Sequence, residues 1–139
     1  MYYINSALRQ WSGRGEFMDF DNTVPIYVQI MNLIKKEIIL GKLQLGEKVL
    51  STREYAQNLK VNPNTMVRVF NELEREGVTF TKRGIGTFIT ESKDRVESMK
   101  REMAEDIVRN FIDGMLELGF TFNDMIDLIK YRLEGEAIQ

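Results

Sequence analysis

The sequence contains no cysteine and no histidine. Without cysteine the chain has neither disulfide bonds nor a thiolate metal site, as is usual for proteins of the reducing cytoplasm. Without histidine it lacks the most common general base and the most common ligand of transition metals. Only carboxylates remain for acid–base chemistry, so we expect a protein that is not an enzyme and that holds no metal and no cofactor.

Long hydrophobic runs are also missing. No run approaches the ~20 apolar residues that a helix needs to cross a bilayer, and the N-terminus does not show the charged-then-apolar order of a secretory signal. These absences predict a cytoplasmic protein without a membrane partner. The 139 residues suggest one domain or two small ones, and 43% hydrophobic residues are enough for a packed core.

The net charge of -2 hides two parts of opposite sign. Residues 26–92 contain ten lysine and arginine residues against seven acidic ones, whereas residues 93–139 contain seven against eleven. A basic region within a nearly neutral chain can bind a phosphate backbone, because only the local surface matters. A solvated surface with a chance asymmetry of charge explains the same counts, so charge alone leaves both interpretations open.

Residues 1–17 do not match the rest of the chain. They follow neither a helical nor a strand period, and they include Ser12-Gly13-Arg14-Gly15. We interpret them as an expression leader, with the native protein starting at Met18; the alternative is a native disordered arm. Arms of some DNA-binding domains enter the minor groove, but Arg9 and Arg14 are the only basic residues here.

The first helix is predicted to run from Pro25 or Ile26 to Leu40. Its apolar residues recur with a helical period and form one wide face: Ile26, Tyr27, Ile30, Met31, Ile34 and Ile38. The connector 42–50 is expected to turn at a glycine and to point three apolar side chains inward: Leu43, Leu45 and Val49.

Two short helices follow, with a tight turn between them. The first starts with a capping box, in which the Ser51 hydroxyl takes an N–H of the first turn and Glu54 reaches back. The second starts with Asn62 as its cap and Pro63 as its first residue, and it runs to about Glu76. The apolar period predicts their inward residues, which are Tyr55, Ala56, Leu59, Met66, Val69, Phe70 and Leu73.

A two-stranded hairpin is predicted directly after these helices. Residues 78–82 and 87–90 alternate in polarity and are rich in valine, phenylalanine, isoleucine and threonine. The tip between them, Arg83-Gly84-Ile85-Gly86, is basic, and its glycines permit a tight connection. Two helices, a short turn and a basic hairpin form a winged helix-turn-helix. We therefore predict a mainly α-helical fold with one small β-hairpin wing.

A long helix over 92–118 and a shorter helix from 121 onward form a predicted αα-hairpin. Each helix has an apolar stripe, and two helices alone cannot hide both stripes, so we expect a homodimer. The predicted dimer interface consists of Val96, Met99, Met103, Ile107, Phe111, Met115, Phe122, Ile126 and Ile129. A ligand pocket lined by the methionines and a hard-cation site among the carboxylates are the alternatives at this point.

The winged helix-turn-helix predicts DNA binding by residues 18–91 and leaves 92–139 as the dimerisation and effector region. The second short helix would enter the major groove N-terminus first, while the first crosses the backbone. The Asn64 side chain can form two hydrogen bonds with adenine, and Thr65 can bind a phosphate or contact a thymine methyl. Arg68 can bind a guanine or a phosphate. The predicted DNA-contacting residues are Ser51, Arg53, Asn62, Asn64, Thr65, Arg68, Lys82, Arg83, Gly84 and Gly86.

Four segments resemble the GntR family of bacterial transcription regulators, and in particular its YtrA-like branch. They are residues 50–56 (LSTREYA), 61–65 (VNPNT), 72–77 (ELEREG) and 83–88 (RGIGTF). The resemblance implies a homodimer that binds a two-fold symmetric DNA operator, usually as a repressor. It also implies a small helical region that serves dimerisation and the response to a small-molecule effector.

The family motif also assigns DNA-facing positions in this chain. Those positions are Arg53, Asn64, Thr65, Arg68 and Gly86. Pro63 and Val67 stand where many members have arginine, so the guanine contacts of those arginines do not transfer to this chain. Leu45 and Leu50 stand where the family usually has proline, which makes the rigidity of the connector different here.

Two other functions fit parts of the sequence. A winged helix also serves as a protein-interaction module without DNA function, because a fold does not by itself decide a function. The polar start of the second short helix and the basic hairpin favour DNA over a protein partner. A small enzyme that uses carboxylates alone is the third interpretation, and no motif supports it.

Overall fold

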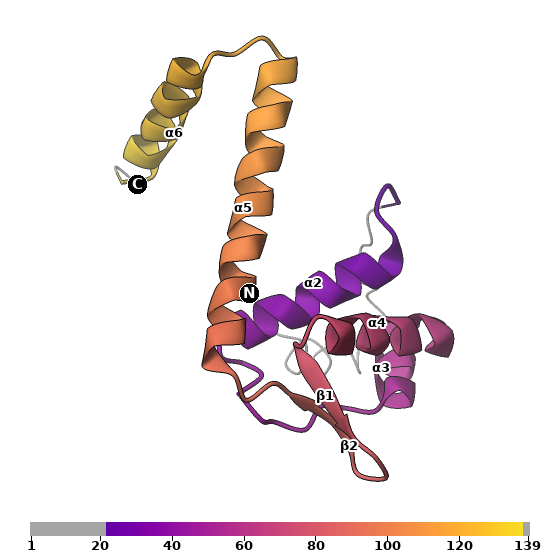
Figure 1. Ribbon diagram of the computed structural model, residues 1–139. Helices are drawn as coiled ribbons and strands as arrows, with labels where there is room; N and C mark the ends of the chain where they lie inside the picture. Colours follow the sequence, from indigo (N-terminus) through magenta and orange to yellow (C-terminus); the bar gives the residue numbers. More distant parts are fainter. Residues whose placement is uncertain (1–21, 138–139) are drawn as a thin grey trace. The chain divides into compact units, whose positions relative to one another are not determined.

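The structure is a computed structural model that describes residues 22–137 (Figure 1). Its elements are α2 (Ile26–Ile39), α3 (Thr52–Leu59), α4 (Pro63–Arg75), β1 (Thr79–Lys82), β2 (Gly86–Ile89), α5 (Lys93–Glu117) and α6 (Phe122–Ala137). The predicted fold class, mainly helical with one hairpin, is confirmed. The chain divides into two compact units, one ending at Met99 and the other beginning at Lys100. The interpretation of residues 1–17 lies outside the described residues.

Helices α3 and α4 begin where their capping residues predict. The Asn64 N–H donates to the Asn62 side-chain oxygen at 2.8 Å, and the Glu54 N–H donates to the Ser51 hydroxyl at 3.1 Å. The Glu54 carboxylate in turn accepts a hydrogen bond from the Ser51 hydroxyl at 3.0 Å. Lys60 ends α3 in the left-handed conformation (φ 52°), which makes the tight turn into α4.

The core of the first unit forms where α4 packs against both α2 and α3. The rings of Tyr55 and Phe70 meet there with their centroids 5.4 Å apart. All seven inward positions predicted for α3 and α4 are buried, as are most of those predicted for α2. Burial of these apolar side chains is the main source of stability for helices that are too short to persist alone.

Two residues that we expected to point inward are exposed instead. Ile26 is 44% exposed, because it is the first residue of α2 and lies at the margin of the helix packing. Leu45 is 45% exposed, because a bond from the Glu47 N–H to the Gln44 carbonyl (3.1 Å) places it at the tip of a turn. The connector prediction holds for Leu43 and Val49, which are buried.

The hairpin has one inner face and one outer face. Strands β1 and β2 pair antiparallel, with Thr79 opposite Ile89, Phe80 opposite Phe88 and Lys82 opposite Gly86. Thr79 and Ile89 are buried, so their face of the hairpin points to the core. Phe80, Phe88 and Lys82 therefore lie together on the other face.

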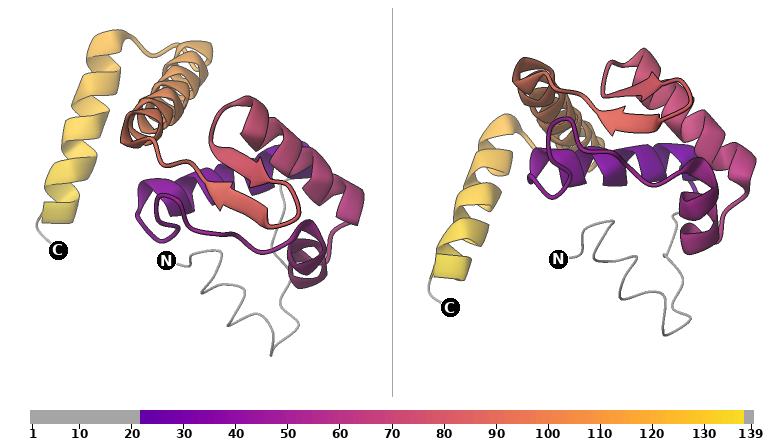
Figure 2. Two further views of the ribbon diagram at one scale, coloured as in Figure 1. Left: turned by 60° about the horizontal axis from the view of Figure 1, so that its bottom comes forward. Right: turned by 90° about the horizontal axis from the view of Figure 1, so that it is seen from below.

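The connector before α3 adds a short third edge to this hairpin. Lys48 forms a β-bridge with Phe88, and the Val49 N–H donates to the Thr87 carbonyl at 2.9 Å. A further bond joins the Ile89 N–H to the Glu47 carbonyl at 2.8 Å. Figure 2 shows this connector running alongside β2 on its way to α3. The segment that we expected to be a connector thus also pairs with the wing.

Helix α5 starts within the first unit. The Arg95 N–H donates to the Ser92 hydroxyl at 3.1 Å, and the Arg95 guanidinium donates to the Glu76 carbonyl at 2.7 Å, at the end of α4. Met99, one turn later, is only 1% exposed. These contacts attach the first turns of α5 to the end of α4.

Helix α6 starts with a capping box. The Asp124 N–H donates to the Thr121 hydroxyl at 3.2 Å, and the Thr121 N–H donates to the Asp124 carboxylate at 2.9 Å. Hydrogen bonding to the Thr121 backbone N–H first, and to the Thr121 side chain second, lowers the pKa of the Asp124 carboxyl. None of the helices within residues 22–137 has the length and apolar character needed to cross a membrane.

Candidate nucleic-acid interface

The first turns of α4 present a polar face away from the core. Asn62, Asn64, Val67 and Arg68 are exposed and Thr65 is half-buried, whereas Met66, Val69 and Phe70 on the other face are buried. Pro63 occupies the first helical position, where its missing N–H costs nothing. Side chains on this face are free to approach an external surface, as the sequence predicts.

Helix α3 lies against α4 near the start of that face (Figure 1). Ser51, which caps α3, and Arg53, in its first turn, are both exposed. The predicted residues of α3 and α4 therefore belong to one helix-turn-helix, in which both helix starts are accessible. Exposed helix starts offer backbone N–H groups and a partial positive charge to an anion such as phosphate.

Arg68 has a neighbour that the sequence did not indicate. Its guanidinium carbon lies 3.7 Å from the centroid of the Tyr27 ring, which comes from the start of α2. Such stacking of a guanidinium on an aromatic face is favourable. Sequence periodicity assigned Tyr27 to the core, and it is in fact half-buried beneath Arg68.

The wing carries a second group of basic side chains. The Lys82 ammonium lies 4.9 Å from the centroid of the Phe88 ring and 5.8 Å from that of Phe80, and the two rings stack 5.6 Å apart. Arg83 and Gly84 are exposed at the tip, where Gly84 adopts a φ of 77°. Residues other than glycine rarely adopt this backbone conformation, so Gly84 permits the tight turn.

Lys48 belongs to this basic group, although sequence reasoning missed it. Its side chain passes Gly86 so closely that a Cβ on Gly86 would lie 2.7 Å from the Lys48 Cε. Its position follows from the β-bridge to Phe88, which joins segments 40 residues apart in sequence. No local sequence pattern signals that pairing, so only the tertiary structure could place Lys48 here.

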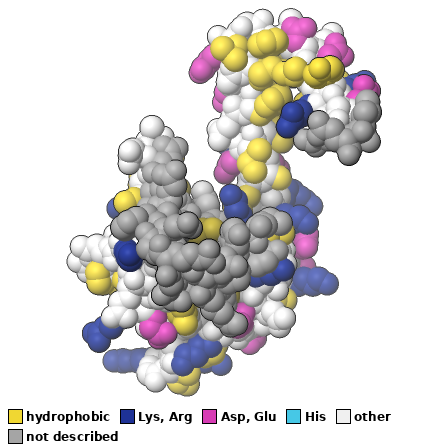
Figure 3. All heavy atoms as spheres, turned by 180° about the vertical axis from the view of Figure 1, so that it is seen from behind, with side chains coloured by type: hydrophobic (Ala, Val, Ile, Leu, Met, Phe, Trp, Pro, Cys, Tyr) yellow, Lys and Arg dark blue, Asp and Glu magenta, His cyan; other side chains and the backbone are white. Residues whose placement is uncertain are grey.

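Among the described residues, the basic side chains of this surface have no acidic partners. Elsewhere in the described chain Lys35 pairs with Glu76 at 2.7 Å and Arg75 with Glu72 at 3.0 Å. By contrast, within residues 22–137 no ion pair involves the cations of the candidate site, which are Arg53, Arg68, Lys82, Arg83 and Lys48. Lysine and arginine side chains stand out at the lower end of the molecule in Figure 3, where the wing tip lies in Figure 1.

The second unit exposes a different kind of surface. Ile107 of α5 and Phe122 of α6 are 65% and 62% exposed, and Ile126 and Ile129 are also exposed. Figure 3 shows a band of apolar side chains over these helices, with acidic side chains along its margin. An open apolar groove of about 420 Å³ lies between the helices and is lined by Ile107, Val108, Phe111, Ile112, Phe122, Met125, Ile126 and Ile129.

The remaining predicted interface residues differ in exposure. Val96, Met103, Phe111 and Met115 are half-buried. Met99 is buried within its own chain, and this burial argues against the interface role predicted for it. In the part of the chain that the structure describes, no group of acidic side chains is arranged to hold a metal ion.

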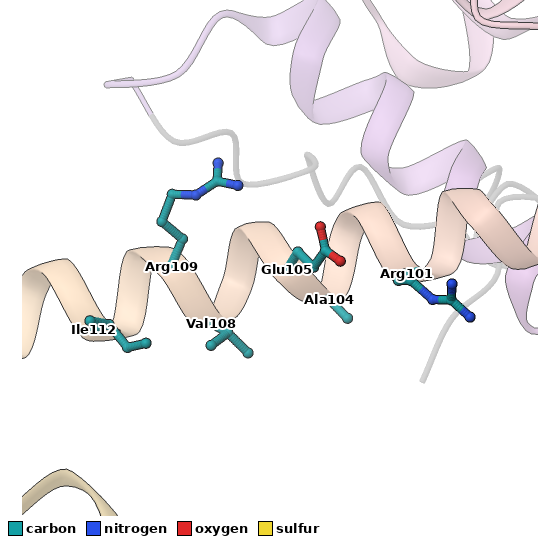
Figure 4. Close-up of a pocket in the computed structure, with 6 residues that line it drawn as sticks. All are labelled: Arg101, Ala104, Glu105, Val108, Arg109 and Ile112. Carbon is teal, nitrogen blue, oxygen red and sulfur yellow. The ribbon is translucent and has the colours of Figure 1, made fainter. Parts of the chain in front are cut away.

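A second apolar hollow of about 500 Å³ runs along α5 (Figure 4). Ala104, Val108 and Ile112 project from one side of the helix in a row, and Glu105 and Arg109 stand away from that row. Arg109 is bonded to Asp106 at 3.2 Å, one turn earlier in α5. The surface of α5 thus offers an apolar strip with charged side chains at its edge.

Comparison with known proteins matches this architecture. Residues 26–89 match the family described as bacterial regulatory proteins, gntR family. The chain is 40% identical to the HTH-type transcriptional regulator YhcF of Bacillus subtilis, over 84% of this chain and 96% of YhcF. It is 36% identical to the HTH-type transcriptional repressor YtrA of the same organism, over 81% of this chain and 88% of YtrA.

A solved structure shares the fold over nearly its whole length. It is a GntR family transcriptional regulator from Listeria monocytogenes, which superposes with a TM-score of 0.74 at 40% sequence identity. The match covers 81% of this chain and 98% of the Listeria protein. These similarities extend beyond the helix-turn-helix and include part of the C-terminal helices.

Proposed function

The chain belongs to the gntR family of bacterial regulatory proteins and is a DNA-binding transcriptional regulator, and we propose that it acts as a homodimeric repressor on a two-fold symmetric operator. In this proposal residues 18–91 bind DNA, and residues 92–139 hold two copies together. The relatives are transcriptional regulators, and no enzyme family is among the matches reported above.

The exposed polar face at the start of α4 is the observation that carries the DNA-reading part. Asn64 and Arg68 lie one turn apart on this face, so both reach a groove that the helix enters N-terminus first. Asn64 matches the donor and acceptor of adenine, and Arg68 matches the two acceptors of guanine. Thr65, between them in sequence, is assigned a phosphate or a thymine methyl.

Phosphate contacts are assigned to the start of α3 and to the wing. Ser51 and Arg53 are placed at the backbone beside the groove, and the Asn62 side-chain amide retains donors beyond its capping oxygen. The wing contributes Lys82 and Arg83, and its glycines, Gly84 and Gly86, bring the backbone close to the DNA. Because no acidic residue of the described range pairs with these cations, phosphate would neutralise them without first breaking such an ion pair.

The apolar surface of α5 and α6 supports the proposed dimerisation. Large apolar side chains on both helices remain exposed in the single chain, and a second copy of the same surface would cover them. Two linked heads bind far more tightly than one, because the second contact becomes intramolecular. If both heads read the major groove on one face of the DNA, half-site centres lie ~10 bp or a multiple apart.

Repression and its release complete the proposal. The relative YtrA is named as a transcriptional repressor, and binding of a dimer over a promoter blocks polymerase by occlusion. A small-molecule effector would act through α5 and α6 by changing the angle between the two heads. A ligand acts in this way only if it binds one angle more tightly than the other.

The test compares base reading with backbone binding. The preferred duplex is selected from a random library with the full-length protein, and affinity is measured for that duplex and for a random one over a range of salt. Arg68→Ala should reduce the preference for the selected duplex. Arg83→Ala should weaken both duplexes equally and lower the salt slope by about 1 per bound head.

Two results would contradict the proposal. An unchanged sequence preference in Arg68→Ala would remove the role given to α4. No salt-dependent binding to any duplex at low salt would instead favour a winged-helix module that binds a protein partner.

A further inference from the structure

Tyr27 and Arg68 come from different helices, and the Arg68 guanidinium lies over the Tyr27 ring on the exposed side of α4. The Arg68 guanidinium carbon lies 3.7 Å from the Tyr27 ring centroid, which is the separation expected for a stacked pair. Tyr27 is the second residue of α2, and α2 packs along α4. The ring is therefore carried by a helix that is itself anchored in the core.

Stacking leaves the useful edge of the guanidinium free. An arginine side chain binds an aromatic ring through its flat face and binds guanine through the N–H groups in its plane. No residue in the described range 22–137 accepts a hydrogen bond from the Arg68 guanidinium or pairs with it. The in-plane donors thus remain available while the ring fixes the plane in which they lie.

Arg68 has no substitute on its helix. The basic residues of α4 are Arg68 and Arg75, and Arg75 is bound to Glu72 at 3.0 Å in the last turns. A flexible arginine would lose side-chain freedom on binding a base, whereas an arginine that is already stacked loses less. Restraint of the Arg68 side chain therefore contributes more to base recognition here than it would in a helix that presents several arginines.

We propose that Tyr27 is a positioning residue for base recognition: its ring holds the Arg68 guanidinium so that the N–H edge meets a guanine in the major groove. This inference rests on the proposed function and goes further, since it assigns part of the sequence specificity to a residue of α2 that touches no base. The chemical partner is the acceptor edge of guanine, O6 and N7.

The experiment uses the full-length protein, the selected duplex and a random duplex. Tyr27→Leu removes the ring but keeps an apolar side chain, whereas Tyr27→Phe keeps the ring and removes the hydroxyl. Tyr27→Leu should weaken binding to the selected duplex about 3- to 10-fold and leave binding to the random duplex and the salt slope unchanged. Tyr27→Phe should bind both duplexes like the unmodified protein.

A second pair of variants separates positioning from folding. Arg68→Lys keeps the charge but loses the flat fork, so it should lose preference for the selected duplex as Tyr27→Leu does. In an Arg68→Ala background, Tyr27→Leu should have no further effect on either duplex. Thermal unfolding of each variant shows whether the fold is retained.

Several outcomes would overturn the inference. They are an equal loss on both duplexes in Tyr27→Leu, a loss in Tyr27→Phe, or an undiminished effect of Tyr27→Leu when Arg68 is absent. If Arg68→Ala itself keeps its preference, the proposed reading by α4 fails and Tyr27 loses its role with it. If Arg68→Ala loses preference and Tyr27→Leu does not, only the positioning role is wrong.

Discussion

Gly86 of the wing leaves space through which the side chain of Lys48 passes. A Cβ at Gly86 would lie 2.7 Å from the Lys48 Cε and 3.5 Å from its Nζ. Gly86 also has a φ of 148°, a conformation that other residues rarely adopt. The glycine therefore meets two demands, one from its own backbone and one from a lysine that belongs to a distant segment.

Gly86→Ala should destabilise the fold by about 1–3 kcal/mol, because alanine is strained at this φ. The collision with Lys48 itself should cost little stability, since the end of a lysine chain can move aside. The collision should displace the Lys48 ammonium from the wing. The double variant Gly86→Ala/Lys48→Ala should therefore lose less DNA affinity than the sum of the losses in the two single variants. A double-mutant cycle on affinity and on urea unfolding measures both effects. If the two losses of affinity are additive, the position of the Lys48 ammonium does not depend on the space beside Gly86.

Lys48→Gln should weaken the selected and the random duplex by the same factor and lower the slope of log affinity against log salt by about 1 per bound head. The reason is that a lysine at the edge of the wing offers a point charge to phosphate and no base-specific geometry. Lys130→Gln on α6 removes the same charge outside the candidate site and should leave the slope unchanged. Equal slopes for the two variants would exclude Lys48 from the DNA-binding surface.

Tyr55→Phe should stabilise the protein by about 1 kcal/mol at neutral pH. The Tyr55 side chain is fully buried, and no described residue forms a hydrogen bond with its hydroxyl, so removal of that group relieves a desolvation cost. Urea unfolding at pH 7 measures the difference, with Tyr131→Phe as an exposed control that should change nothing. A loss of stability in Tyr55→Phe would mean that the hydroxyl has a partner.

The same residue predicts a change at alkaline pH. Burial raises the pKa of Tyr55 well above its usual value, and the carboxylates of Glu37 and Glu47 raise it further. The unfolded chain ionises this tyrosine from about pH 10, whereas the folded chain does not, so stability should fall as pH rises above about 10. Comparison of urea unfolding at pH 9 and at pH 10.5 should show a smaller fall in Tyr55→Phe. An identical fall in both proteins would assign the alkaline effect to other groups.

Ile107→Asp should convert a dimer to a monomer. Ile107 is exposed in the single chain, so a charge there harms nothing until a partner buries it. Ile85→Asp makes the same change at an exposed position on the wing and should leave the oligomeric state unchanged. Sedimentation over a range of protein concentration distinguishes the two variants. A dimer that persists in Ile107→Asp would place the interface elsewhere.

The helix caps and the glycine turns were predicted correctly, because they depend on interactions between residues that are close in sequence. The Ser51 and Asn62 side chains accept hydrogen bonds from N–H groups within a few residues, so a short stretch of sequence contains both partners. The inward residues of α3 and α4 were also correct, because a strong helical period fixes which face is apolar. The predictions that Ile26 and Leu45 point inward were wrong, because the exposure of these residues depends on where the neighbouring elements end.

For the candidate site, the sequence supplied the residue types and their order. Asn64, Thr65 and Arg68 lie on one exposed face as predicted, although their contacts with DNA stay predictions. The two neighbours that change the chemistry, Tyr27 and Lys48, could not be found in this way. Each reaches the site through packing or strand pairing between segments that are far apart in sequence.

The sequence by itself determined the order of the helices and the wing, their starting points and the family to which the chain belongs. It could do so because caps, turn glycines and apolar periods act over a few residues and leave a readable pattern. Only the tertiary structure decided that the aromatic ring of α2 lies under Arg68 and that a lysine from the connector crosses the wing at Gly86. Such contacts depend on the way whole elements pack, and packing brings together residues that no local pattern connects.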